Sequence, residues 1–369
     1  MKILLCFGTR PEAIKMAPLY HELQKKTNFE IKVCVTAQHR EMLYQVLDFF
    51  EIIPDYDLNV MQANQSLNGL SSKIISRMDE VLVTEKPDLV LVHGDTTTSS
   101  MVAIAAFHLG IKVGHIEAGL RTYNKQAPFP EEINRQITSR IVDMHFTPTK
   151  QATQNLLNEG ISLNSILETG NTVIDALFWT ISKIEKKGYA HHEIDELKNI
   201  IPVGKKIILV TGHRRENFGE GMQHLCEALF KISERDDVSI VYPVHLNPNV
   251  KDVVYELLSN RKNIQLVAPV SYPAFVWLMQ QSFLIVTDSG GIQEEAPSLG
   301  KPVVVTRTVS ERPEGVAAGF STLVGTDKNK IINAIEDILE NFKGFEKPVN
   351  PYGNGEASRK INDYLLTKN

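Results

Sequence analysis

Short apolar runs alternate with longer amphipathic stretches along the chain. Runs rich in aliphatic and β-branched residues predict strands at residues 2–7, 31–36, 88–93, 112–116 and 144–147. Between them, residues 13–26 and 99–109 have the apolar periodicity of helices. This alternation is typical of βαβ units, so the first part of the chain is predicted to form an α/β domain with a parallel sheet.

The alternation stops between about residues 180 and 205, which are polar and poorly periodic, and then resumes. Further strands are predicted at 206–211, 238–243, 264–267, 283–287 and 302–306. A chain of 369 residues is long for one domain. We therefore predict two Rossmann-like, doubly wound α/β domains facing a central cleft. They comprise residues 1–180 and 205–350, joined by a linker at 181–204, with a tail at 351–369 whose short helix is expected to cross back to the first domain.

Composition narrows the class of protein. The net charge of −5, without long runs of one sign, argues against an electrostatic nucleic-acid binder. Three scattered cysteines without a C-x-x-C motif argue against a disulfide framework or a zinc site. The apolar start is broken at residues 8–12, and no apolar run approaches the length that spans a membrane. We expect a cytoplasmic protein that does not act at a membrane.

Two acidic residues follow consecutive predicted strands. In open α/β sheets, ligands bind beyond the carboxyl ends of the strands, which is where Asp95 and Glu117 are expected. If these strands are neighbours, the two carboxylates project from one sheet edge, and acids that close favour proton transfer. For Asp95, capping of the next helix near residues 96–98 is an equal alternative.

A second pair of acids follows the Pro-flanked segment 121–130. Pro130 suits the first helical position, which would place Glu131 and Glu132 in the first turn and Arg135 four residues after Glu131. The alternative to a functional role is an acid-capped helix with a surface ion pair. The preceding loop is long enough to fold over the predicted cleft, which makes Glu131 a further candidate acid.

Glycines and basic residues at other strand ends suggest anion binding. Ser289, Gly290 and Gly291 follow a predicted strand and open a helix, so their N–H groups could bind phosphate; an ordinary Ser N-cap is the alternative. Glu294 and Glu295 could contact a ribose or be first-turn acids favoured by the helix dipole.

The segment after the first strand carries Arg10 and Lys15 but lacks G-x-G-x-x-G, which argues against a hydride-transfer cofactor. The histidine spacing fits no H-E-x-x-H metal motif, and His213 and His245 are the histidines placed at strand ends.

Taken together, these segments resemble the non-hydrolysing bacterial UDP-N-acetylglucosamine 2-epimerases over essentially the whole chain. The resemblance rests on residues 8–18 (GTRPEAIKMAP), 36–40 (TAQHR), 92–97 (VHGDTT), 115–121 (HIEAGLR), 128–132 (PFPEE), 212–217 (GHRREN), 243–248 (PVHLNP) and 287–297 (TDSGGIQEEAP).

The resemblance implies a GT-B fold and reversible conversion of UDP-N-acetylglucosamine to UDP-N-acetylmannosamine for surface polysaccharide synthesis. UDP would be eliminated to leave a 2-acetamidoglucal and then added back, with neither a cofactor nor a metal. It also implies a homodimer.

The resemblance also implies roles for individual residues. Asp95, Glu117 and Glu131 would be the acid/base carboxylates, and His213 would lie by the departing diphosphate. UDP or the sugar would be bound by Arg10, Lys15, Arg135, Phe275, Ser289, Gly290, Gly291, Glu295 and Arg312, with Glu295 on the ribose. Some relatives are activated by UDP-N-acetylglucosamine at a neighbouring site, and Gln38, Arg214 and His245 match that site.

Three departures from the family pattern leave other functions open. Asn64 stands where some relatives carry Arg, residues 307–312 (RTVSER) lack the usual Asp after the first Arg, and Gln126-Ala127 replaces the usual Tyr-Ser. A variant substrate is one possibility. The alternatives to the epimerase are a GT-B glycosyltransferase, a hydrolysing epimerase that releases N-acetylmannosamine, and a non-catalytic nucleotide-sugar sensor.

Overall fold

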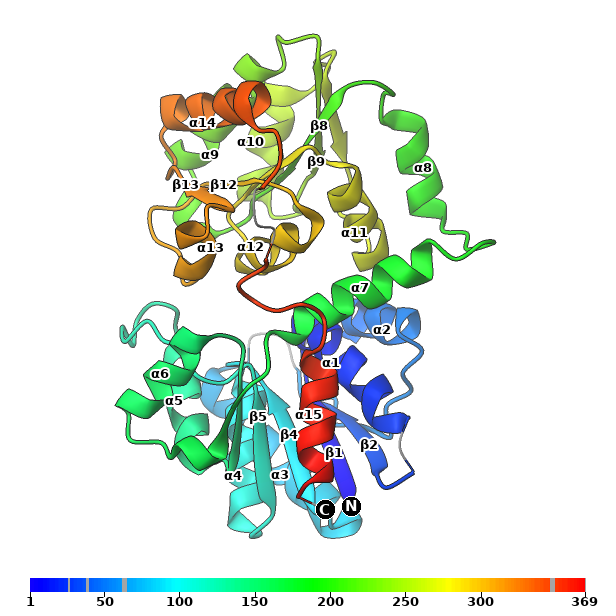
Figure 1. The fold of residues 1–369 in the computed structure, drawn as a ribbon, viewed down its shortest axis with the longest axis vertical. Coiled ribbons are helices and arrows are strands. Elements are labelled where there is room, and N and C mark those ends of the chain that lie inside the picture. The colour runs from blue at the N-terminus through cyan, green and yellow to red at the C-terminus, as the bar shows by residue number, and fades with distance from the viewer. Residues whose placement is uncertain (26, 38–39, 62–64, 346–348, 369) are drawn as a thin grey trace. The chain divides into compact units, whose positions relative to one another are not determined.

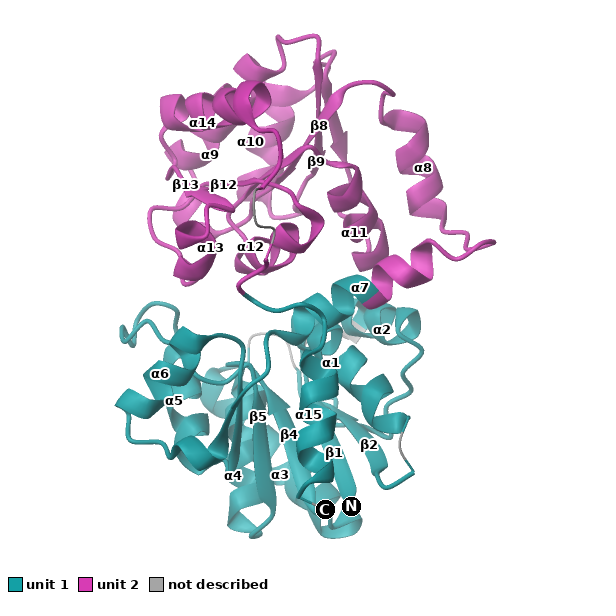
Figure 2. Ribbon diagram, in the orientation of Figure 1, with its two compact units in different colours: residues 1–178, 352–369 teal, residues 179–351 magenta. Residues whose placement is uncertain are grey.

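The chain divides into two compact units (Figure 1, Figure 2). The computed structural model describes residues 1–25, 27–37, 40–61, 65–345 and 349–368. Unit 1 comprises Met1–Phe178 and Tyr352–Asn369, and unit 2 comprises Trp179–Pro351. The boundary between the units therefore falls inside a helix, α7 (Thr172–Ile184).

Unit 1 is built on a parallel sheet with the strand order β3-β2-β1-β4-β5-β6-β7. The strands are β1 (Lys2–Phe7), β2 (Glu30–Val35), β3 (Tyr56–Asp57), β4 (Leu89–His93), β5 (Lys112–Ile116), β6 (Met144–Thr147) and β7 (Ile166–Glu168). The strand order reverses direction between β1 and β4, and such a switch point is where open α/β sheets bind ligands.

Helices flank this sheet. They are α1 (Arg10–Gln24), α2 (Arg40–Phe49), α3 (Leu67–Glu85), α4 (Thr97–His108), α5 (Glu131–Ile141), α6 (Lys150–Asn158), the first part of α7 and α15 (Ala357–Leu366), with a short 3₁₀ helix η1 (Leu163–Ser165). Because helices cover both faces of a parallel sheet, its central strands are buried on both sides, and every residue of β4 is buried.

Unit 2 has a second parallel sheet with the order β10-β9-β8-β11-β12-β13. Its strands are β8 (Lys206–Thr211), β9 (Val238–Pro243), β10 (Ile264–Val267), β11 (Leu284–Thr287), β12 (Val303–Val305) and β13 (Ser321–Leu323). Its helices are α8 (His192–Ile200), η2 (Arg215–Asn217), α9 (Glu220–Ile232), α10 (Pro248–Leu258), α11 (Tyr272–Gln281), α12 (Gly290–Glu295), η3 (Ala296–Leu299), α13 (Pro313–Ala317) and α14 (Lys328–Asn341).

The predicted α/β class is confirmed, and each predicted strand lies within one residue of an observed strand at either end. Three strands were missed: β3, β7 and β13. Each has only two or three residues and lies at the edge of its sheet, where burial on both faces does not impose an apolar run.

The segment predicted as a linker, 181–204, contains the end of α7 and the whole of α8. The amphipathic helix α8 buries Ile194 and Leu197 and contacts α11, but its other positions are polar, which hid the helix in the sequence. Residues of the tail belong to unit 1, where α15 packs against α1. The carboxylate of Asp175 in α7 accepts hydrogen bonds from the N–H groups of Ala357 (3.2 Å) and Ser358 (2.7 Å).

Gly8 lies where three elements of unit 1 meet. A Cβ atom at this position would lie 2.0 Å from Oγ1 of Thr36 and 2.6 Å from Oγ1 of Thr98, two hydroxyls that are 2.8 Å apart. We therefore expect Gly8→Ala to cost about 1–3 kcal/mol of unfolding free energy. The measurement is urea denaturation, with Gly291→Ala as control because no heavy atom lies within 4 Å of its added Cβ. Equal stability of the two variants would contradict the expectation.

Candidate active site

Three neighbouring strands of unit 1 end in polar segments. Strand β4 pairs in parallel with β1 on one side and with β5 on the other, and His93 at the end of β4 faces Ile116 at the end of β5. The segments that carry Asp95 and Glu117 therefore leave adjacent strands at the same edge of the sheet. The two predicted strands that these acids follow are neighbours, so the condition on which their proximity depended is met.

Glu117 is buried and held by basic and amide side chains. The ammonium group of Lys15, from α1, lies 2.8 and 2.7 Å from its two carboxylate oxygens. Nε2 of His93 lies 3.0 Å from Oε2, and Nδ2 of Asn171 lies 3.5 Å from Oε1. The backbone of Glu117 has a φ of 63°, a left-handed conformation that costs energy for a residue other than glycine. Such strain is common where a side chain must be held at a functional site.

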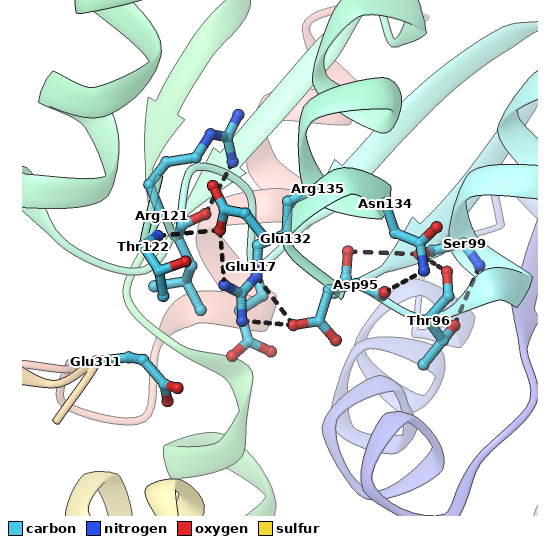
Figure 3. A network of polar contacts seen from close by, with 12 residues as sticks. Asp95, Thr96, Ser99, Glu117, Arg121, Thr122, Glu132, Asn134, Arg135 and Glu311 are labelled. Atoms are coloured by element: carbon cyan, nitrogen blue, oxygen red, sulfur yellow. Dashed lines mark hydrogen bonds and ion pairs between the residues drawn. The ribbon is translucent and has the colours of Figure 1, made fainter. Parts of the chain in front are cut away.

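Asp95 is anchored by Arg135 (Figure 3). Nε and Nη2 of the guanidinium both donate to Oδ2 of Asp95, at 2.9 and 2.7 Å, and the side chain of Asp95 remains 28% exposed. The cap of α4 is Thr96, whose hydroxyl accepts from the N–H of Ser99 at 3.2 Å. The alternative that Asp95 caps this helix is therefore wrong, because the neighbouring hydroxyl fills that position.

Arg135 joins two carboxylates rather than lying on the surface. It is buried, and its Nη1 donates to Glu132 at 3.2 Å on the side opposite Asp95 (Figure 3). Helix α5 begins at Glu131, and Pro130 is its N-cap. We predicted Pro130 at the first helical position, but it lies one residue before that position. Glu131 and Glu132 both lie in the first turn, as predicted. The surface ion-pair alternative for Arg135 is excluded by its burial.

Glu132 shapes the loop that precedes α5. Its carboxylate accepts from the backbone N–H groups of Thr122 (2.9 Å) and Tyr123 (3.1 Å), and it is fully buried. Burial opposes ionisation, but these hydrogen bonds, together with those from Gln136 and the charge of Arg135, prevail and lower the pKa of Glu132. Glu132 therefore remains a carboxylate that fixes the loop and orients Arg135.

Glu12 is a buried acid that our functional predictions missed. Its Oε2 accepts from the N–H groups of Gly8 (3.0 Å) and Thr9 (2.8 Å), and its Oε1 accepts from the hydroxyl of Thr96 (2.7 Å). Burial raises its pKa, although the hydrogen bonds oppose this. The T-x-x-E spacing of a capping box at residues 9–12 was the available signal. Glu12 links the start of α1 to the start of α4.

His115 is a buried neutral histidine in β5. Its Nε2 lies 2.7 Å from the carbonyl oxygen of Gly94, and burial lowers the pKa of the imidazole to about 3. The unfolded chain binds this proton near pH 6.5, so stability is lost as the pH falls from about 6.5 toward 3, by about 1.4 kcal/mol per pH unit. We expect His115→Gln to remove this part of the slope when urea denaturation is followed between pH 7 and 5. An unchanged slope would contradict the assignment.

Three neighbouring strands of unit 2 also end in polar residues. His245 follows β9, His213 follows β8 and Asp288 follows β11, and β8 pairs with both other strands. The two imidazole rings stack at a centroid distance of 5.1 Å and an angle of 15°. Partial burial and the neighbouring His213 lower the pKa of His245. Oδ2 of Asp288 accepts from the N–H groups of His213 (3.0 Å) and Arg214 (2.9 Å).

The candidate phosphate-binding residues open α12, directly after Asp288. Ser289 is the N-cap, but its side chain accepts no capping hydrogen bond within the described part of the chain, so the ordinary Ser cap is not formed. A Cβ atom at Gly290 would lie 2.9 Å from Cζ of Arg312, which packs over this glycine. The N–H groups at this end of α12 thus lie beside a guanidinium.

The two glutamates of this segment lie at the end of α12, so the alternative that they are first-turn acids is wrong. Glu294 accepts from Nε of Arg312 at 2.9 Å, and Glu295 accepts from the hydroxyl of Tyr272 at 2.8 Å. Both glutamates are buried. Phe275, a predicted substrate contact, is half-buried in α11.

The remaining predicted positions fall as follows. Arg10 is the first residue of α1 and is half-buried. Arg307 is the first residue of the segment 307–312, which differs from the family pattern, and its Nε donates to Glu216 at 2.7 Å within unit 2. Gln38, a predicted regulatory residue, and Asn64 lie outside the described residues.

Within the described ranges, no group of three or more His, Cys, Asp or Glu side chains could hold a metal ion. None of the helices described is long and apolar enough to cross a membrane.

Two α/β units on parallel sheets, with ionisable side chains at the carboxyl ends of the central strands, have the architecture of the GT-B fold. A protein-family model described as UDP-N-acetylglucosamine 2-epimerase matches residues 21–366. The chain belongs to the UDP-N-acetylglucosamine 2-epimerase family and is an isomerase. The predicted family and enzyme class are confirmed.

The similarity extends over the full length of known proteins. The UDP-N-acetylglucosamine 2-epimerase of Escherichia coli K12 is 52% identical over 99% of this chain and 98% of its own. The crystal structure of the Neisseria meningitidis enzyme bound to UDP-GlcNAc has a TM-score of 0.93 at 50% identity and full coverage of both chains. That of the Methanocaldococcus jannaschii enzyme, in complex with UDP-GlcNAc and UDP, has a TM-score of 0.84 at 35% identity, also at full coverage.

A glycosyltransferase of kitacinnamycin shares only the fold, with 11% identity and a TM-score of 0.66 over 100% of this chain and 98% of that one.

Proposed function

We propose that this chain interconverts UDP-N-acetylglucosamine and UDP-N-acetylmannosamine by inverting C2 without releasing free sugar. The observation that carries the proposal is the pair of anchored carboxylates in unit 1: Asp95 on Arg135, and Glu117 on Lys15. Inversion at C2 requires a base and an acid held in fixed positions. A sensor would need neither, and a glycosyltransferase leaves the pair unexplained.

The proposed reaction proceeds by elimination and re-addition. A carboxylate takes the C2 proton, the C–H electron pair forms the C1=C2 double bond, and the C1–O bond breaks with its electrons leaving on UDP. UDP then adds back to C1 of the 2-acetamidoglucal while a proton is delivered to the opposite face of C2. The base and the acid are drawn from Asp95, Glu117 and Glu131. The C2–H bond is weakly acidic, so a stabilised leaving group is essential.

Unit 2 supplies the groups proposed to stabilise the leaving diphosphate. The N–H groups of Gly290 and Gly291, the side chain of Ser289 and the guanidinium of Arg312 lie together at the start of α12, which suits an anion. The N–H of Ser289 itself donates to the hydroxyl of Thr287 at 2.9 Å. His213 follows β8, the strand that pairs with β11, and its side chain is half-exposed. It would contact the diphosphate. Arg10 and Lys15 are proposed to assist, Arg135 and Phe275 to contact the substrate, and Glu295 to contact the ribose.

Lys15 and Arg135 each bind a candidate catalytic carboxylate in the structure. Their proposed work on substrate therefore includes positioning those acids.

Further aspects of the proposal concern the setting of the enzyme. It would act in the cytoplasm as a homodimer and supply a precursor for cell-surface polysaccharide. Arg214 and His245, with Gln38, are proposed to form a second site for UDP-N-acetylglucosamine that activates the enzyme. The stacking of His245 on His213 supports a link between the two sites. The Methanocaldococcus relative, crystallised with both UDP-GlcNAc and UDP, is consistent with this view.

The decisive experiment is incubation with UDP-N-acetylglucosamine in D₂O, followed by NMR of the C2 position. We expect loss of the C2 proton signal together with the appearance of UDP-N-acetylmannosamine. Release of free N-acetylmannosamine would instead assign a hydrolysing epimerase. Absence of both exchange and product would leave a transferase or a sensor and overturn the proposal.

A further inference from the structure

One buried carboxylate oxygen of Asp288 accepts no hydrogen bond within the described part of the chain. Oδ2 of Asp288 accepts from two backbone N–H groups and from Nδ2 of Asn217 at 3.1 Å. Oδ1 accepts no hydrogen bond from any described residue, although the side chain is fully buried. An unsatisfied buried carboxylate oxygen costs free energy, so a hydrogen-bond donor is expected to approach it.

The candidate hydrogen-bond donor for this oxygen is the imidazole of His213. Nδ1 of the imidazole lies 3.9 Å from Oδ1 of Asp288. The same carboxylate accepts a hydrogen bond from the N–H of His213 through Oδ2, which ties the loop after β8 to Asp288. The register of Thr211 with Thr287 places the two residues at the ends of adjacent strands. One carboxylate thus holds the histidine main chain and flanks its ring.

The imidazole ring of His213 is covered on one face and half-exposed to solvent. It stacks on His245, and its side chain is 49% exposed. The separation of 3.9 Å exceeds a hydrogen bond, so this half-exposed ring has to rotate for the bond to form. Catalytic hydrogen bonds often tighten only when substrate is bound.

We propose that Asp288 is a positioning residue for His213, which accepts the Nδ1–H so that Nε2 is presented to the diphosphate. This inference rests on the role proposed above for His213. A carboxylate on one ring nitrogen fixes the tautomer and orientation of an imidazole and stabilises its protonated form. Asp288 also directly precedes Ser289, so the same residue places the histidine beside the start of α12.

The test is Asp288→Asn in the full chain. The amide oxygen can still accept the three N–H groups, while the amide NH₂ replaces Oδ1 and opposes Nδ1–H. We expect kcat for epimerisation to fall about 100-fold or more, with KM and the affinity for UDP within about threefold of wild type. In a double-mutant cycle, adding Asp288→Asn to His213→Asn is expected to cause little further loss, because the carboxylate acts through the ring.

A matched control is Asp143→Asn. Asp143 lies just before β6 in unit 1, and its carboxylate also accepts a hydrogen bond from a backbone N–H, that of Val113 at 2.8 Å. It is expected to retain kcat. Independent losses in the two single variants that multiply in the double variant would overturn the proposal, as would wild-type kcat in a folded Asp288→Asn protein.

A second measurement needs no variant. Long-range ¹H–¹⁵N NMR of the wild-type protein reports which nitrogen of His213 carries the proton, and we expect the Nδ1–H tautomer in the neutral ring. The Nε2–H tautomer would overturn the inference about Asp288. Failure of the wild-type protein to epimerise UDP-N-acetylglucosamine would be a different result, because it would remove the proposed function itself.

Discussion

Asp95→Asn is expected to lower kcat for epimerisation by about 10²–10⁴-fold while leaving the affinity for UDP within about threefold. The amide is isosteric and can still accept a hydrogen bond from Arg135, but it can neither take nor give the C2 proton. The carboxylate it replaces is part of the anchored pair at the ends of β4 and β5. The measurements are steady-state turnover, C2 exchange in D₂O and calorimetric titration with UDP.

An exposed carboxylate of the same unit provides the control for this variant. Asp79→Asn, in α3, is expected to keep wild-type turnover. If Asp95→Asn retained turnover within a few-fold, Asp95 would be only an anchor for the guanidinium of Arg135. Loss of turnover together with loss of UDP binding would instead indicate general damage to the fold.

Lys15→Met is expected to lower the free energy of unfolding by about 3–5 kcal/mol. The side chains of Lys15 and Glu117 are only 11% and 6% exposed, so removal of the ammonium leaves a buried carboxylate without its closest cation. The double variant Lys15→Met/Glu117→Gln should recover much of this loss, since replacing both partners leaves no uncompensated charge. Urea denaturation of the single and double variants measures both effects.

The matched control is an exposed Lys–Glu pair at the C-terminal end of α1. Lys25 pairs with Glu22 at 2.6 Å, but Lys25 is 66% exposed, so Lys25→Met is expected to cost less than about 1 kcal/mol. Equal losses in Lys15→Met and Lys25→Met would show that the pair with Glu117 contributes no more than a surface ion pair.

The strands and the segments that follow them could be predicted from the sequence because their signals are local. A strand buried on both faces must be apolar along its length, as in β4, and the polar residues after it stand out by contrast. The short edge strands β3, β7 and β13 lack that constraint. Helix α8 was missed because it buries only Ile194 and Leu197.

The sequence by itself determined that ionisable residues gather at strand ends, and which family the chain resembles. It left open whether Asp95 was a cap or an acid, because both roles suit the start of a helix. Tertiary structure excluded the cap by placing Thr96 at that position and Arg135, 40 residues away, on the carboxylate of Asp95.

The partners of the other key groups are more distant still. Lys15 meets Glu117 across 102 residues, and Asp288 meets the backbone of His213 across 75. Side-chain pairing over such separations leaves no periodic trace in the sequence. It is set by which strands lie next to each other and by where each strand ends.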